Sequence, residues 1–147
     1  MTDAIDARVT DALHALSGKE RRHMTHAPFR PSFDAIADEL REDENVDKLC
    51  GAVSASLGRG VLALSGDRLI FSGTRVGGSS WAFADIIDVD VRRGSFTLSS
   101  AITLHVEGGK HVLALTCGRR SAGEFAEAVQ TAVRHSKTVP HPKMTAA

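Results

Sequence analysis

The stretch GVLALSGDRLIFSG, residues 60–73, decides the fold because it places an apolar run on either side of a Gly-Asp pair. Glycine at the first position of a two-residue loop is typical of a type II′ turn, so the pattern predicts a β-hairpin with this pair at its tip. In this register one face carries two opposed pairs, Leu64 with Leu69 and Leu62 with Phe71. We expect that face to contact the core, and the mixed face to lie outside, with Ala63, Ser65, Arg68 and Ile70.

A second hairpin is predicted over residues 95–115, where apolar and polar residues alternate up to the glycines Gly108 and Gly109. A turn at these glycines sets Glu107 opposite Lys110 as a pair of opposite charges. The same register opposes Leu104 to Leu113 and Ile102 to Leu115. Between the two hairpins, alternation of apolar and charged residues predicts a half-exposed strand whose apolar face carries Ile87, Val89 and Val91.

Helical spacing is confined to the two ends of the chain. Two amphipathic helices are predicted before the strands, over Thr2–Ser17 and Ser32–Glu42, and a basic linker containing two prolines separates them. A closing helix is predicted from about Ala122 to His135, introduced by the capping-box sequence SAGE. The predicted core residues are Leu62, Leu64, Leu69, Phe71, Ile102, Leu104, Leu113, Leu115, Phe125 and Val129.

Composition excludes several classes of protein. The chain has 147 residues, about one domain, and its 18 basic residues balance 18 acidic ones. The net charge of zero and the scarcity of aromatic residues argue against a nucleic-acid-binding protein. The N-terminus lacks the pattern of a signal peptide, and no apolar run approaches the roughly 20 residues of a membrane span, so we expect a cytoplasmic protein.

No pattern in the sequence indicates a catalytic, cofactor or metal site. The GxSxG, HExxH and phosphate-loop patterns are absent, and His23 and His26 have no third ligand near them in sequence. Cys50 and Cys117 lack CxxC spacing, so we expect two reduced thiols on strands, with a disulfide or redox pair as the alternative. We expect no enzyme, no cofactor and no metal.

The segments LALSGDRLIFSG, WAFADIIDVDV and EFAEAVQTAV, at residues 62–73, 81–91 and 124–133, together resemble the bacterial pleckstrin-homology-like (PH-like) domains. The resemblance covers about Val46 to His135. It implies a mainly β fold with flanking helices, a bent and partly open antiparallel barrel of seven strands that a C-terminal helix closes at one end. The expected organisation is a helical extension (1–45), the PH-like domain (46–135) and a disordered tail (136–147).

We therefore expect a non-enzymatic interaction module that binds a protein or peptide, for which an open sheet edge could add a strand. The alternative is an anionic lipid surface or phosphorylated ligand bound through Lys48, Arg59 and Arg75. Phosphoinositide-binding relatives carry several basic residues around the loop joining the first two strands, where this chain has Arg59 alone, with Lys48 upstream. The N-terminal helices either pack on their own barrel, which we favour, or pair in a homodimer.

Overall fold

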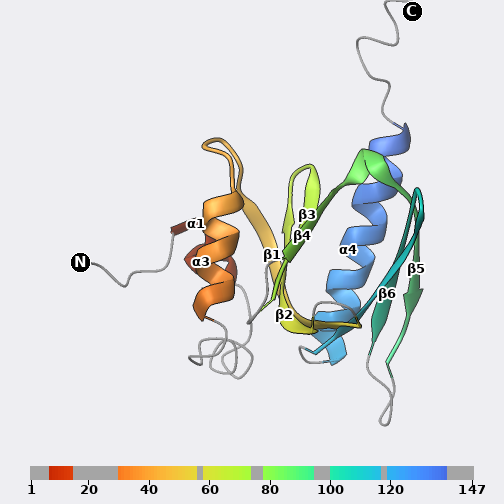
Figure 1. Ribbon diagram of the computed structural model, residues 1–147, viewed down its shortest axis with the longest axis horizontal. Coiled ribbons are helices and arrows are strands. Elements are labelled where there is room, and N and C mark those ends of the chain that lie inside the picture. The colour runs from red at the N-terminus through yellow and green to blue at the C-terminus, as the bar shows by residue number, and fades with distance from the viewer. Residues whose placement is uncertain are drawn as a thin grey trace, which may run out of the picture.

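The computed structural model describes residues 7–14, 30–55, 58–73, 78–94, 100–116 and 119–138. Two helices come first, seven strands follow, and a long helix closes the described chain (Figure 1). In chain order the elements are α1 (Ala7–His14), α3 (Arg30–Glu39), β1 (Val46–Ser54), β2 (Gly58–Ser65), β3 (Arg68–Gly73), β4 (Gly78–Ala82), the 3-10 helix η2 (Phe83–Asp85), β5 (Ile86–Arg92), β6 (Ala101–Val106), β7 (Gly109–Leu115) and α4 (Arg119–Thr138).

The strands form one antiparallel sheet in the order β4-β3-β2-β1-β7-β6-β5. It is open, because β4 and β5 lie at its two edges although they follow each other in the chain. The sheet bends around α4, while α1 and α3 lie on the opposite side of β1 to β3 (Figure 1). The predicted architecture of an open barrel with a closing helix and two preceding helices is confirmed.

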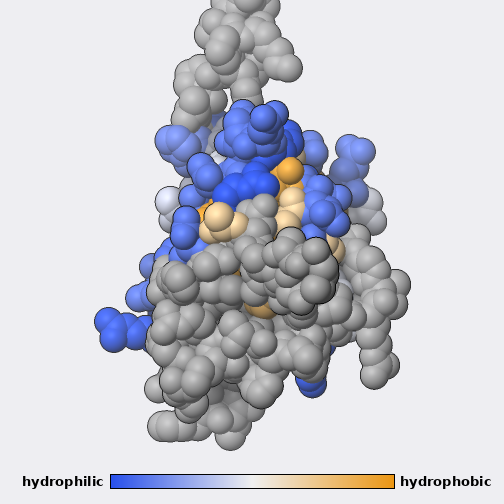
Figure 2. Space-filling view, turned by 90° about the vertical axis from the view of Figure 1, so that its left-hand side faces the viewer, coloured by the Kyte–Doolittle hydropathy of each residue, from blue (hydrophilic) through white to orange (hydrophobic). Residues whose placement is uncertain are grey.

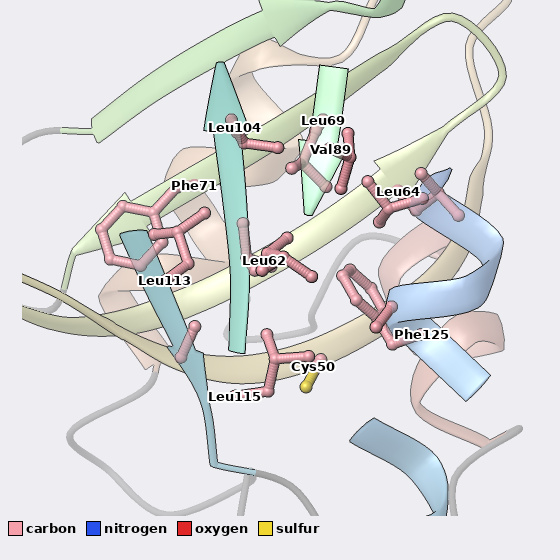
Figure 3. Close-up of a cluster of buried hydrophobic side chains, with 14 of the residues drawn as sticks. Cys50, Leu62, Leu64, Leu69, Phe71, Val89, Leu104, Leu113, Leu115 and Phe125 are labelled. Atoms are coloured by element: carbon pink, nitrogen blue, oxygen red, sulfur yellow. The ribbon is translucent and has the colours of Figure 1, made fainter. Parts of the chain in front are cut away.

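The concave side of the sheet and α4 enclose the inner core. Figure 3 shows Phe125 of α4 directed toward strand residues such as Leu62 and Leu64. All ten predicted core residues are buried in this cluster. The inner core consists of Cys50, Ala52, Leu62, Leu64, Leu69, Phe71, Phe83, Ile86, Val89, Ile102, Leu104, Leu113, Leu115, Ala122, Phe125, Ala126, Val129 and Val133.

A second buried cluster, the outer core, lies between the other face of β1 to β3 and the two N-terminal helices. It consists of Val9, Ala12, Phe33, Ile36, Leu40, Val46, Leu49, Val61, Ala63 and Ile70. The preference for helices packed on their own barrel is confirmed for α1 and α3. The expectation that Ala63 and Ile70 lie outside is wrong, because these helices cover them. On this side of the molecule, most described side chains at the surface are hydrophilic (Figure 2).

The first hairpin has the predicted register, with Leu64 paired to Leu69 and Leu62 to Phe71, but not the predicted turn. A type II′ turn needs a positive φ at Gly66, and Gly66 has none. The Ser65 hydroxyl instead accepts a hydrogen bond from the backbone N–H of Arg68 at 3.2 Å. A serine before the turn can hold a conformation that needs no left-handed residue.

In the second hairpin the predicted pairs are wrong by two residues. Leu104 pairs with His111 and Ile102 with Leu113. The loop is Glu107-Gly108, because Gly108 takes the left-handed conformation (φ 92°) that a turn of type II requires at its second central position. A shift of two residues leaves every side chain on its original face, so the predicted core residues are correct although their cross-strand partners are not.

Local irregularities explain the other differences. The β5–β6 register shifts between Ile86 and Asp88, so Ile86 takes the buried position and Ile87 is 61% exposed, contrary to the expected alternation. Helix α4 begins at Arg119, so the capping box at Ser121 lies inside the helix. It ends at Thr138, just before the residue that precedes Pro140, and residues 136–138 are therefore helical rather than part of a tail.

Candidate functional site

A groove of 990 Å³ runs between the C-terminal half of α4 and the facing ends of β1, the β2–β3 turn and η2. Figure 1 shows this end of α4 close to the connection between β4 and β5. We call it the α4 groove. Its apolar lining consists of Leu64, Ala82, Phe83, Ala84, Ala128 and Ala132, and its charged or titratable lining of Asp47, Lys48, Asp67, Glu124, Glu127 and His135.

Most of the side chains that line the α4 groove are accessible to solvent. All six charged or titratable lining residues are exposed, as are Ala82 and Ala84, while Leu64 and Phe83 are buried beneath them. Sites for small molecules enclose most of the ligand's surface in a concave, mainly apolar pocket. The α4 groove is instead an open surface, of the kind that a protein segment can enter.

An irregularity at the start of β1 directs two neighbouring residues into the groove. In a regular strand Asp47 and Lys48 point to opposite faces. Here the β1–β2 register shifts between Val46 and Lys48, and both residues line the groove. Such bulges re-aim side chains, and the sequence offered no turn glycine or other signal from which this one could be predicted.

The β2–β3 turn forms one wall of the groove and is fixed from two sides. The backbone N–H of Phe83 in η2 donates to the Asp67 carbonyl at 3.0 Å. The Arg41 guanidinium donates to the Asp67 carboxylate at 2.5 Å from the segment that joins α3 to β1. These contacts hold the wall in place relative to both η2 and the N-terminal extension.

The next residue, Arg68, joins the hairpin to the same N-terminal segment. It forms ion pairs with Glu44 at 2.8 Å and with Glu39 at 3.1 Å. The Arg68 guanidinium is the main cause that lowers the pKa of Glu44 to about 2, against the opposing effect of burial, and the backbone N–H of Arg41 adds to it. Hydrogen bonding to Glu44 in turn raises the pKa of Arg68. This pair is structural, since neither residue lines the groove.

Carboxylates that line the groove already form ion pairs with arginines, but these pairs are weak. Glu127 pairs with Arg93 at 2.9 Å and Glu124 with Arg120 at 3.8 Å, and these two glutamate side chains are each 61% exposed. Exposed pairs of this kind contribute about 0–1 kcal/mol. Arg41, Arg93 and Arg120 lie outside the groove lining, so the groove itself presents four carboxylates to one lysine among its described lining residues.

Of the three predicted ligand-binding residues, the structure describes Lys48 and Arg59, and these two lie apart. Lys48 lines the α4 groove on the inner side of the sheet and pairs with Leu64. Arg59 pairs with Val53 at the other end of the β1–β2 pair of strands, on the opposite face of the sheet. The distance along β2 from Arg59 to Leu64 is about 17 Å at the rise of an extended strand. Arg75 lies outside the described residues.

The two sheet edges differ in how far they are covered. Helix α4 packs beside β5, and the Gln130 side chain donates to the Val89 carbonyl at 3.1 Å. Strand β4 pairs with β3 on one side, and its end at Ala82 opens into the α4 groove. The edge nearest to the groove is therefore that of β4.

Other candidate chemistry finds little support in the described part of the chain. It contains no cluster of three or more His, Cys, Asp or Glu residues arranged to hold a metal, and His23 and His26 lie outside it. Cys50 is disulfide-bonded, so the expectation of a reduced thiol there is wrong, because sequence spacing cannot reveal a pairing that the tertiary fold sets. Cys117 lies outside the described residues. No described helix has both the length and the apolar composition needed to cross a membrane.

No protein-family model and no curated protein matches this chain. Among solved structures, the Vps36 N-terminal PH domain matches with a TM-score of 0.55 and 19% identity, over 68% of this chain and 86% of that one. The fold is PH-like. Two weaker matches are the C-terminal domain of an unknown protein from Leishmania infantum (TM-score 0.49, 18% identity, 69% of this chain and 92% of that one) and the PDZ-RhoGEF DH/PH domains in complex with GTP-gamma-S-activated RhoA (0.46, 12%, 87% and 39%).

Identities this low concern the fold alone, and a PH-like fold does not fix a task. The expected PH-like resemblance is confirmed at this level. The candidate site of this chain is therefore defined by its own residues, those of the α4 groove.

Proposed function

We propose that this PH-like chain is a non-enzymatic interaction module that binds a segment of another protein in the α4 groove. The groove itself carries the proposal: its lining combines apolar with charged residues, and one of its walls, the β2–β3 turn, is held to η2 by a backbone hydrogen bond. An apolar centre with a polar rim is the usual anatomy of a protein-binding surface.

The adjoining edge of β4 supports the same function. A segment that lies over Ala82 and Ala84 meets the end of an edge strand as well as α4. Strand addition at such an edge supplies backbone hydrogen bonds, while the groove supplies side-chain contacts. Binding to anionic lipid through Lys48, Arg59 and Arg75 receives less support, because Lys48 and Arg59 lie on opposite faces.

The test is a selection of short random peptides displayed on phage against the full chain, followed by fluorescence anisotropy of the selected peptides. Thr131→Trp introduces a large side chain into the groove, whereas Arg134→Trp changes an exposed residue of the same helix outside it. We expect Thr131→Trp to weaken binding at least about tenfold and Arg134→Trp to leave it unchanged. Equal effects of the two variants would exclude the groove as the binding site.

Sedimentation with phosphatidylcholine vesicles, with and without phosphatidylserine, tests the competing lipid function. The proposal predicts no difference between the two vesicle types. Salt-sensitive binding to the anionic vesicles that is lost in Arg59→Glu would contradict it and favour the lipid surface.

A further inference from the structure

The α4 groove is acidic on both of its walls. Asp47 and Asp67 lie on the wall formed by the strand ends, and Glu124 and Glu127 lie on α4. Lys48 is the one lysine or arginine among the described lining residues, and His135 is the other basic side chain there. The lining also offers apolar residues such as Ala84.

We infer that the groove takes a partner segment that combines apolar side chains with lysine or arginine. The inference rests on the proposed function, because it names the chemistry of the segment bound at that same site. Complementary charges set the choice of partner and its orientation, whereas like charges brought together across an interface disfavour binding. A segment whose charged residues are acidic would meet carboxylates on either side of it.

The arginine partners of the two groove glutamates do not prevent this recognition. Arg93 and Arg120 contact Glu127 and Glu124 from outside the groove, and the glutamate side chains remain 61% exposed. Their carboxylate oxygens can therefore accept further hydrogen bonds from a lysine or arginine side chain within the groove. The Asp47 carboxylate also disfavours an anionic headgroup at Lys48, because the two residues line the groove next to each other.

A matched pair of synthetic peptides tests the charge preference directly. Both carry the same leucines and alanines in an amphipathic pattern, with lysine at every charged position in one and glutamate in the other. Fluorescence anisotropy with the full chain should show the lysine peptide binding at least about tenfold more tightly at low salt, and the difference should shrink at high salt. Equal binding, tighter binding of the glutamate peptide, or no binding of either peptide would overturn the inference.

Charge reversal on the protein locates the effect. Glu124→Lys changes a groove carboxylate, and Glu107→Lys makes the same change in net charge at an exposed position outside the groove, in the β6–β7 turn. We expect Glu124→Lys to weaken binding of the lysine peptide about tenfold and Glu107→Lys to leave it nearly unchanged. Equal losses in both variants would mean that the peptide responds to net charge alone, which would also overturn the inference.

The two hypotheses fail in different ways. If phage-selected peptides lose affinity in Thr131→Trp but contain no excess of lysine and arginine, the groove binds a segment and the inferred chemistry is wrong. If their affinity is insensitive to Thr131→Trp, the proposed function itself fails. Light scattering covers one other occupant: a dimer that becomes monomeric in Thr131→Trp, but not in Arg134→Trp, would mean that a second copy of the chain fills the groove.

Discussion

The guanidinium of Arg68 holds the buried carboxylate of Glu44 through two hydrogen bonds, from Nε at 2.9 Å and from Nη2 at 2.8 Å. The two side chains are 12% and 3% exposed. Arg8 of α1 donates to the Glu44 carbonyl at 2.9 Å, so this residue also contacts the first helix. The N-terminal extension is therefore attached to the sheet by charged hydrogen bonds as well as by the outer core.

Removing the cation of this pair should destabilise the protein strongly. Arg68→Met leaves the Glu44 carboxylate buried without its main partner, and breaking a buried pair in this way costs about 3–5 kcal/mol. Arg93→Met is the matched control, because the Arg93–Glu127 pair is 76% and 61% exposed and should contribute at most about 1 kcal/mol. Urea unfolding of both variants measures the difference, and equal losses would contradict a buried role for Arg68.

The Glu44–Arg68 pair should also make stability depend on pH. Folding lowers the pKa of Glu44 from 4.5 to about 2, so the folded state favours the ionised form. The resulting stability is fully present above pH 4.5 and is lost as the pH falls toward 2, an amount on the order of 3 kcal/mol. The difference in unfolding free energy between the wild type and Glu44→Gln should therefore shrink as the pH falls through this range. A difference that stays constant with pH would contradict the assignment.

The inner core was predictable because it depends only on which face a strand residue occupies. Leu104 lies between Thr103 and His105, so its burial followed from this alternation even though it pairs with His111 and not with the predicted Leu113. The burial of Ile70 was not predicted, since it depends on helices packing from far along the chain. The unbroken apolar runs of β2 and β3 were the available signal, because strands covered on both faces lose polar alternation.

The candidate site was less accessible to prediction than the core. Lys48 was named from its charge, but its neighbours in the groove come from β1, the β2–β3 turn, η2 and α4, which the sequence alone does not place together. The bulge that directs both Asp47 and Lys48 into the groove has no sequence signature. Glu124 and Glu127 read as the solvated face of a helix, which is a common and uninformative pattern.

The outer core makes a prediction about the N-terminal helices. Ile36 of α3 is fully buried against the sheet, so Ile36→Ala should lower the unfolding free energy by about 2–5 kcal/mol. Asp38→Ala, at an exposed position of the same helix, should change it by at most about 0.5 kcal/mol.

Light scattering should give the mass of one chain for the wild type, because α1 and α3 already cover their apolar residues. A stable dimer would contradict this expectation.

The inner core makes a parallel prediction at Leu104. This β6 side chain is fully buried in the inner core, so Leu104→Ala removes apolar contacts and leaves a cavity. The expected loss is about 2–5 kcal/mol, measured by urea unfolding. Thr103→Ala, on the opposite face of β6, is the control and should have a much smaller effect. Similar losses at both positions would mean that the assigned faces of β6 are incorrect.

Gly60 provides a test of how closely β2 and β3 approach each other. It pairs with Gly73, and a Cβ atom at residue 60 would lie 2.2 Å from the Ser72 carbonyl oxygen and 2.9 Å from the Gly73 Cα. Both are backbone atoms of the paired strand, so they cannot move aside without disturbing the hairpin. Gly60→Ala should therefore destabilise the protein by about 1–3 kcal/mol or more, as overpacking does.

Gly66→Ala is the matched control, since a Cβ there meets no atom within 4 Å and its φ is not positive. Because alanine restricts the unfolded chain more than glycine does, Gly66→Ala should be neutral or stabilising by about 0.4–1 kcal/mol. Urea unfolding of the two variants separates close strand contact from the general effect of adding a methyl group. If Gly60→Ala were as stable as Gly66→Ala, the pairing of Gly60 with Gly73 could not be as close as described.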